Sequence, residues 1–292
     1  MKILIVGIKN NPQVERLKGE AINRGHELSA VLSSELSLYF KGGNPVFLIG
    51  NIDISSLDLI YLWTVEKRRW EWYAASQFLT KKYKIKIVGE LMNPSPIAEF
   101  LALWHSHIPI PKTAVICSYK EISKVSKNFS YPVILKAAYI HQGKSVSLVK
   151  SKYELVSGIE RLKKEFATSI FIVRKVIRSR GDIRVFCLGG KAVAAMKRFP
   201  LANEFRANIS QGAKGKNLDL QKYPDVKDLA ERSAKALDIE IAGVDIIIDE
   251  QTKEKYVLEV NSGPQFSGIE KYTNINIAAE IIKYFEILQK KI

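Results

Sequence analysis

Residues 242–266 read AGVDIIIDEQTKEKYVLEVNSGPQF, two apolar runs joined by a short polar segment. The runs at 242–250 and 255–261 have the composition of central β-strands, and the segment between them has the length of a hairpin turn. Antiparallel pairing would place Asp245, near the start of the first strand, beside Glu259 and Asn261, near the end of the second. Glu259 and Asn261 are two residues apart, so their side chains point to the same face. We therefore predict a hairpin with two carboxylates and an amide gathered on one face.

This predicted cluster favours a metal site. Two converging carboxylates repel each other unless a cation or a proton lies between them. An all-oxygen set of Asp, Glu and Asn suits Mg²⁺, which completes its coordination with water and with substrate phosphates. The alternative is that Asp245 and Glu259 are unrelated surface carboxylates, although charges without a partner in central strands are costly.

A metal that carries phosphates needs cationic partners, and several basic side chains are candidates. Lys136 ends the β-rich run YPVILK and precedes a loop that contains Gly143, a placement that suits a nucleotide phosphate. Arginine side chains suit phosphate and carboxylate anions because their planar forks donate two hydrogen bonds. The downstream candidates are Asp182 and Arg184 in GDIRVF, Arg198 in MKRF, and Arg206 with Asn208 in EFRAN.

The first 92 residues alternate apolar runs with helical patterns, which predicts an open parallel α/β sheet. The expected strands are MKILIVG, HELSAVLS, LDLIYLW (57–63) and IKIVG (85–89). Between the first two, Val14, Leu17 and Ala21 recur at helical spacing, and Gly25 follows as a helix terminator. A second helix is expected over 68–82.

The rest of the chain predicts an α+β arrangement. A helix is expected to begin near Pro96 and to end before Pro109 and Pro111, where we place a boundary. Four β-rich segments and two helices, at 119–128 and 151–165, then occupy residues 112–176. Gly189 and Gly190 indicate a tight hairpin turn, and further helices are expected at 225–237 and 277–289.

Composition narrows the class of protein. The chain has 292 residues, 47% hydrophobic, and a formal net charge of +15. No run of 18 apolar residues is present, so no membrane span is expected, and MKILIVGIKN is interpreted as a buried strand and not as a signal peptide. Two separate cysteines, Cys117 and Cys187, suit the reducing cytoplasm. The charge favours an anionic partner such as nucleotide, nucleic acid or an acidic protein, unless it serves only solubility.

The order of these stretches carries a family resemblance. Lys136, GDIR (181–184), KR (197–198), FRAN (205–208), AGVD (242–245) and EVNSGPQFSGIEK (259–271) resemble the ATP-grasp superfamily. They are most similar to RimK-like amino-acid ligases, of the type that adds glutamate to ribosomal or carrier proteins. The likeness covers about 131–290, while residues 1–110 match only in outline.

The resemblance implies an ATP-grasp fold of α/β and α+β parts. A pre-ATP-grasp domain with an open parallel sheet would occupy 1–110, a small lid subdomain 111–177, and a catalytic core subdomain with an antiparallel sheet 178–292. Related ligases often form dimers or tetramers, so the resemblance also implies a homo-oligomer.

The resemblance also implies residue roles. Asp245, Glu259 and Asn261 would hold two Mg²⁺ ions, for which Mn²⁺ can substitute. Lys136, Arg184 and Arg206 would act in catalysis. The ATP contacts would come from Lys136, Gly143, Lys175, Val176, Asp182, Arg206 and Asn208, and the acceptor substrate would lie toward Arg198, Ser262 and Gly263.

The implied reaction is ATP- and magnesium-dependent amide formation. ATP would convert a carboxylate to an acyl phosphate, which the amine of glutamate or a related amino acid would attack. The acceptor would be a carboxylate on a small molecule, an acidic peptide or a carrier protein.

Several positions depart from the family pattern. The hinge, acidic in the family, reads Arg174-Lys175-Val176, and Pro96 stands where a basic residue is usual. Ile140 and Ser145 replace lid-loop glycines, and Gln211-Gly212-Ala213 replaces Arg-Gly-Gly. A non-catalytic or regulatory ATP-binding protein of the same fold is therefore an alternative.

Nucleic-acid binding is a weaker alternative. It is raised by the basic balance and by the mixed aromatic and basic segment EKRRWEWYAA (66–75). The same segment also predicts an amphipathic helix with Trp70, Tyr73 and Ala74 facing inward, and no known nucleic-acid motif accompanies it.

Overall fold

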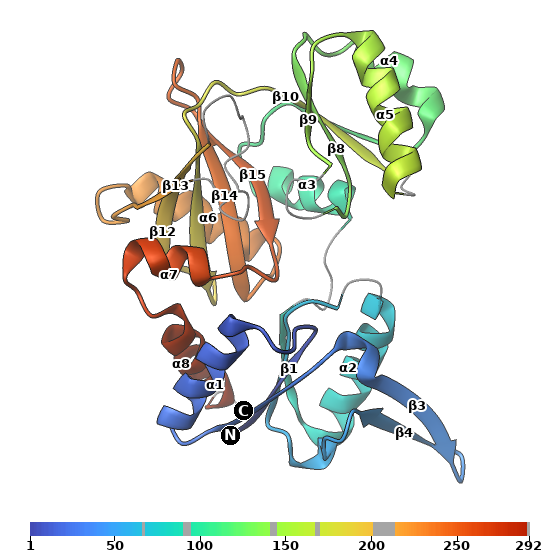
Figure 1. Cartoon of the computed structure of the whole chain (residues 1–292), viewed down its shortest axis with the longest axis vertical. Coiled ribbons are helices and arrows are strands. Elements are labelled where there is room, and N and C mark those ends of the chain that lie inside the picture. The colour runs from blue at the N-terminus through green and yellow to red at the C-terminus, as the bar shows by residue number, and fades with distance from the viewer. Residues whose placement is uncertain (66–67, 90–94, 141–144, 167–169, 201–213, 291–292) are drawn as a thin grey trace.

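The computed structural model describes residues 1–65, 68–89, 95–140, 145–166, 170–200 and 214–290. Its strands form three larger sheets and one isolated hairpin (Figure 1). The first sheet is parallel and the other two are antiparallel. The expected arrangement, a parallel sheet followed by antiparallel sheets, is thus confirmed.

The N-terminal sheet has the strand order β2-β1-β5-β6. Its strands and helices are β1 (Lys2–Val6), α1 (Pro12–Asn23), β2 (Glu27–Val31), β5 (Leu59–Leu62), α2 (Arg69–Tyr83) and β6 (Lys86–Gly89). The predicted inward residues of α1, Val14, Leu17 and Ala21, are all buried. Apolar strands followed by amphipathic helices give this parallel arrangement, because each helix must cover a face of the sheet.

A hairpin of β3 (Leu36–Lys41) and β4 (Asn44–Ile49) extends from this sheet (Figure 1). Its apolar side chains include Leu38, Phe40 and Leu48, all exposed. The sequence analysis did not predict this hairpin. Two strands without a covering layer bury no complete face, so the alternation of buried and exposed residues is missing.

The second sheet has the order β7-β10-β8-β9 and carries helices on one side (Figure 1). Its elements are β7 (Thr113–Ile116), α4 (Ile122–Ser126), β8 (Val133–Ala137), β9 (Ser147–Val149), α5 (Lys152–Phe166) and β10 (Phe171–Lys175). We call this unit the lid. Helix α3 (Pro96–His105) precedes it and lies between the lid and the third sheet (Figure 1).

The third sheet, which we call the core sheet, has the order β13-β12-β11-β14-β15. Its elements are β11 (Asp182–Leu188), β12 (Lys191–Phe199), β13 (Lys214–Asn217), α6 (Pro224–Ala236), β14 (Ile241–Ile248) and β15 (Lys255–Asn261). Gly189 and Gly190 form the β11–β12 turn with φ of +55° and +68°. Both values lie in the left-handed region that favours glycine, which confirms the predicted turn.

Two helices follow the core sheet, α7 (Ser267–Thr273) and α8 (Ile277–Gln289). Helix α8 leaves the core sheet and lies beside α1 (Figure 1). Its Ile281, Ile282 and Phe285 are buried in the same apolar cluster as Ile3 and Tyr61 of the N-terminal sheet. The last helix of the chain therefore completes the core of its first sheet.

Helix α2 corrects one prediction. Trp70, expected to face inward, is 68% exposed, and Ala74, expected there too, is also exposed. Trp72, Ala75 and Leu79 are buried instead. The aromatic residues fall on both sides of this helix, so spacing alone did not identify the buried side. Among the described residues, no helix is long and apolar enough to span a membrane.

Candidate active site

The β14–β15 hairpin brings the predicted oxygen donors together. Asp245 pairs directly with Glu259 across the hairpin, and Gly243 pairs with Asn261. The predicted register is confirmed. The ladder shifts between Asp245 and Ile246, and Leu258 is left without a partner. Such a bulge increases the local twist and is common next to active sites.

Glu259 lies between a lysine and an amide. The ammonium of Lys136, on lid strand β8, donates to Oε2 of Glu259 at 2.6 Å. Nδ2 of Asn261 donates to Oε1 of Glu259 at 3.3 Å and to the Gly243 carbonyl oxygen at 3.2 Å. The charge of Lys136 holds the pKa of Glu259 well below its usual range, despite partial burial. The carboxylate is therefore ionised and able to accept a cation.

Asp245 is 4% exposed and is bound by two arginines. Arg184, its neighbour on β11, contacts both of its carboxylate oxygens, with Nη2 2.7 Å from Oδ2. Arg198, on β12, places Nη2 3.1 Å from the same Oδ2. Buried charges are retained in proteins when they are paired in this way.

Asp182 completes this network. Arg198 donates to both of its oxygens, with Nη2 2.9 Å from Oδ2, and the two residues are cross-strand partners. Burial raises the pKa of Asp182 to about 6, and the neighbouring charge of Asp245 acts in the same direction, while Arg198 opposes the shift. The network thus links strands β11, β12 and β14 on one face of the core sheet.

The donor set fits a magnesium site. Asp245, Glu259 and Asn261 supply two carboxylates and an amide oxygen from adjacent strands, the oxygen chemistry that Mg²⁺ takes. Their charge is balanced by Lys136, Arg184 and Arg198. Within the described ranges, no three His, Cys, Asp or Glu side chains cluster as a metal site by themselves, so the amide is needed to complete the set.

Glu99 is a site residue that the sequence analysis missed. It lies in the first turn of α3, and its Oε1 accepts a hydrogen bond from the backbone N–H of Val260 at 3.2 Å. Burial, and then the charge of Glu259, raise the pKa of Glu99 to about 7, while Lys136 and Arg174 oppose the shift. An acidic residue in the first helical turn usually serves the helix alone, so nothing in the local sequence marked it.

Arg174 joins the same region from lid strand β10. Its guanidinium lies 5.5 Å from the centre of the Phe100 ring, and its Nε donates to Oγ1 of Thr113 at 3.1 Å. Burial lowers the pKa of Arg174, while the charges of Glu259 and Glu99 oppose this. The reversed hinge charge noted in the sequence therefore stands near two carboxylates.

The other predicted residues have different surroundings. Lys175 is exposed at the end of β10, and its N–H donates to the Lys112 carbonyl at 2.9 Å. Ser262 is buried. Gly263 lies so close to the N-terminal sheet that a Cβ there would be 2.2 Å from the Trp63 carbonyl oxygen. Val176 follows β10 and is half-buried, and Gly143, Arg206 and Asn208 lie outside the described residues.

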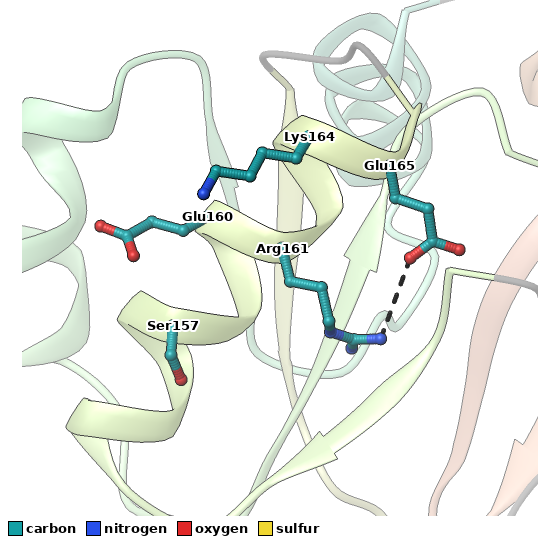
Figure 2. Close-up of a pocket in the computed structure, with 5 residues that line it drawn as sticks. All are labelled: Ser157, Glu160, Arg161, Lys164 and Glu165. Carbon is teal, nitrogen blue, oxygen red and sulfur yellow. Dashed lines mark ion pairs between the residues drawn. The ribbon is translucent and has the colours of Figure 1, made fainter.

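A surface pocket lies on lid helix α5, apart from these residues. It is lined by Ser157, Glu160, Arg161, Lys164 and Glu165 (Figure 2). Arg161 and Glu165 form an exposed ion pair at 4.0 Å, which is typical of a solvated helix face. This pocket contains none of the predicted site residues.

The chain is similar to known proteins over most of its length. Residues 98–285 match the model of the RimK-like ATP-grasp domain. A Legionella pneumophila (strain Corby) protein named probable alpha-L-glutamate ligase is 33% identical over 310 residues, which cover 100% of this chain and 97% of that protein.

Solved structures resemble the whole chain. The RimK domain protein ATP-grasp from Sphaerobacter thermophilus has a TM-score of 0.72 at 17% identity, covering 97% of this chain and 99% of that one. The ATP-grasp ligase PsnB, complexed with a phosphomimetic variant of its minimal precursor, Mg and ADP, has a TM-score of 0.68 at 17% identity. It covers 98% of each chain. These two likenesses show the fold.

Proposed function

This chain belongs to the RimK-like ATP-grasp family and is a ligase, and we propose that it joins a carboxylate to an amine by way of an acyl phosphate. The observation that carries the proposal is the pairing of Asp245 with Glu259 beneath the lid residue Lys136. This contact of an anionic oxygen set with a lid lysine, between lid and core, supports an ATP-dependent reaction there.

The oxygen set is assigned to magnesium. Asp245, Glu259 and Asn261 would hold the two ions, and Mn²⁺ would substitute for them. When bound, the metal neutralises the phosphates of ATP and lowers the barrier to phosphoryl transfer. The carboxylates themselves are paired with cationic side chains of the chain, namely Lys136, Arg184 and Arg198.

The cations would then take part in the reaction. Lys136 can exchange its contact with Glu259 for one with a nucleotide phosphate, because both partners are anionic oxygens. Arg184 lies next to Asp245 and is assigned to the phosphates beside the metal. Arg206 is assigned to the same phosphates, although it lies outside the described residues.

The nucleotide and acceptor would occupy neighbouring parts of the site. We assign adenine to the backbone of Lys175 and Val176, and the ribose side to Asp182. Gly143 and Asn208, outside the described residues, are assigned to the phosphates. Arg198, Ser262 and Gly263 are assigned to the acceptor. The chain is proposed to divide into an N-terminal domain (1–110), a lid subdomain (111–177) and a core subdomain (178–292).

The proposed reaction has two steps, phosphorylation of the carboxylate and formation of the amide bond. A carboxylate oxygen of the acceptor attacks the γ-phosphorus of ATP, the bond to the β–γ bridging oxygen breaks, and ADP leaves. The amine nitrogen then attacks the carbonyl carbon, phosphate leaves with the bonding electrons, and the nitrogen loses a proton. The protein contributes positioning and charge neutralisation in both steps.

Glutamate is the proposed amine donor. The Legionella pneumophila relative, similar over the whole chain, carries the name probable alpha-L-glutamate ligase. The net charge of +15 supports an acidic acceptor, such as an acidic peptide or carrier protein, in the reducing cytoplasm. A homo-oligomer is part of the same proposal.

The first test is ADP release. The protein is incubated with ATP, Mg²⁺, each amino acid in turn and a panel of carboxylate acceptors, and ADP is measured. Glutamate is expected to give the highest rate with an acidic acceptor. If no combination of substrates released ADP, the result would favour the alternative of a regulatory ATP-binding protein. The basic residue Arg174 in the hinge is the observation behind that alternative.

The Glu259→Gln variant is the first specific prediction. It keeps the shape of the side chain and removes the charge that Lys136 and the metal need. We expect turnover to fall by roughly 10²–10³ or more, with an unchanged circular dichroism spectrum. Gln251→Glu, on the exposed turn of the same hairpin, is the control. Unchanged turnover in Glu259→Gln would refute the metal assignment.

A further inference from the structure

The outer edge of β15 is covered by the segment that begins with α3. Strand β15 is the last strand of the core sheet, so the N–H groups on its outer side have no strand partner in the described part of the chain. The N–H of Val257 donates to the Pro109 carbonyl oxygen at 2.9 Å, and that of Val260 donates to Oε1 of Glu99 at 3.2 Å. The two acceptors on one edge are chemically different.

That difference needs an explanation. At Val257 a backbone carbonyl satisfies the N–H without bringing a charge into the interior. At Val260 the acceptor is a half-buried carboxylate, whose desolvation is unfavourable. Hydrogen-bond satisfaction alone did not require Glu99, so the carboxylate has a further role.

Val260 lies in the part of the strand that carries two of the proposed metal ligands. It lies between Glu259 and Asn261, whose side chains share one face of the sheet with Asp245, the cross-strand partner of Glu259. The bulge at Leu258 interrupts the β14–β15 ladder immediately before them. Because a bulge weakens the pairing that orients a strand, the contact from Glu99 supplies a restraint on the outer side that the ladder lacks on the inner side.

The same helix turn also faces the lid. Phe100, next to Glu99, packs under the guanidinium of Arg174 on β10. Arg174 and Lys136 provide positive charge near the Glu99 and Glu259 carboxylates. The hydrogen bond from Val260 to Glu99 therefore ties the end of β15 to a helix that also packs against the lid.

We propose that Glu99 is a positioning residue for the metal site, which holds the bulged end of β15 through the Val260 N–H so that Glu259 and Asn261 face Asp245. The metal part of this inference rests on the proposed function. The hydrogen bond itself does not, and it is tested separately.

The first experiment measures hydrogen exchange at the Val260 amide in the full chain, without metal or nucleotide. Glu99→Ala removes the acceptor, while Glu99→Gln keeps an oxygen that can accept and removes the charge. The matched control is Glu280→Ala, which removes an acidic residue from the first turn of α8 instead. Melting temperature identifies any variant that is not folded.

Exchange at Val260 is expected to be about tenfold faster or more in Glu99→Ala, in keeping with the loss of a hydrogen bond whose donor is left unsatisfied. Glu99→Gln and Glu280→Ala are expected to stay within about threefold of the unmodified chain. A Val260 amide that exchanges at the same rate in folded Glu99→Ala as in the unmodified chain would overturn the inference. Should Glu99→Ala fail to fold, Glu99→Met takes its place, because it keeps the length of the side chain and removes the acceptor, and the same two outcomes support or overturn the inference.

The second experiment measures metal affinity in two ways: the Mg²⁺ concentration for half-maximal ADP release, and Mn²⁺ binding by water-proton relaxation. In Glu99→Ala we expect both midpoints to rise about tenfold while the KM for the amino acid is unchanged, and Glu99→Gln to restore most of the loss. A helix-stabilising role would lower the melting temperature and leave the metal midpoints in place.

The outcomes separate the two proposals. An active unmodified chain with equal metal midpoints in Glu99→Ala would refute the positioning role and leave the ligase proposal intact. An unmodified chain that neither releases ADP nor binds Mn²⁺ would refute the proposed function, and with it the metal part of the inference.

Discussion

At the scale of single residues, the site is governed by charge pairing. Asp182 and Asp245 share Arg198 in the interior of the core sheet, and Asp245 is also paired with Arg184. Arg198, only 4% exposed, contacts both carboxylates. A buried network of this kind depends on each member, because loss of one cation leaves an uncompensated buried charge.

This dependence gives a stability prediction for Arg198→Met. The substitution keeps an apolar stem and leaves Asp182 and Asp245 short of a partner. We expect the free energy of unfolding, measured by urea without metal or nucleotide, to fall by about 3–5 kcal/mol.

Arg180→Met is the matched control for that prediction. Arg180 also pairs with a carboxylate, Glu250 at 3.4 Å, but its side chain is 85% exposed. Exposed ion pairs contribute little, so a loss of less than ~1 kcal/mol is expected. Equal losses in the two variants would show that Arg198 is not essential to the network.

At the scale of elements, local sequence patterns predicted the helices and hairpins, but they did not predict the contacts between distant parts of the chain. The β14–β15 hairpin, the Gly189–Gly190 turn and helix α8 each follow from residues close together in the sequence. The buried side of α2 and the role of Glu99 depend on distant partners; the Glu99–Val260 contact spans 161 residues. Single-sequence patterns do not report such contacts.

Local sequence patterns predicted which residues of the hairpin lie together, and the family resemblance supplied the predicted roles of the site residues. Hairpin spacing alone predicted the pairing of Asp245 with Glu259, which the structure shows. The contact of Lys136 with Glu259 joins the lid to the core, and the spacing within either segment does not determine it. The role of each residue toward ATP and acceptor stays a prediction.

The docking of α8 leads to a prediction on pH. Glu286 accepts hydrogen bonds from Arg24 and interacts with His26, which also contacts the N-terminal amine. These partners, Arg24 first, lower the pKa of Glu286 to about 2, against an ordinary value of 4.5. A lowered carboxyl pKa means that the stabilisation is complete above pH 4.5 and is lost as the pH falls toward 2.

The comparison of Glu286→Gln with the unmodified chain tests this. Urea unfolding is followed from pH 7 to pH 3. The unmodified chain is expected to be more stable at pH 7, and the difference is expected to narrow steadily below pH 4.5. A difference that grows on acidification would contradict the assigned ion pairs. Glu280→Gln, which removes an ion pair with Lys283 within the same helix, is the control.

At the scale of the whole molecule, the net charge of +15 acts on encounter with substrates. Such a charge raises the local concentration of anions around the protein and speeds their association. Salt shortens the range of this attraction to about 10 Å at 0.1 M ionic strength. The sequence predicted an anionic partner on this ground, and the acidic acceptor is the proposed one.

The corresponding prediction concerns KM. The KM of an acidic peptide acceptor is expected to rise several-fold between about 0.05 and 0.5 M salt. The KM of an acceptor whose only charged group is the reacting carboxylate is expected to change much less. Steady-state ADP release with the two acceptors measures both. Equal salt dependence for both would mean that the surface charge does not select the acceptor.

Helix α8 has a consequence for how the polypeptide matures during translation. The ribosome releases the strands of the N-terminal sheet first, but Ile281, Ile282 and Phe285, which cover part of its apolar face, emerge only after the lid and core segments. Until then the nascent chain presents that face to solvent, a surface that chaperones bind and that promotes aggregation. The earliest sheet therefore stays incomplete until α8 has been synthesised, and nascent fragments that stop before α8 are expected to associate with holdase chaperones.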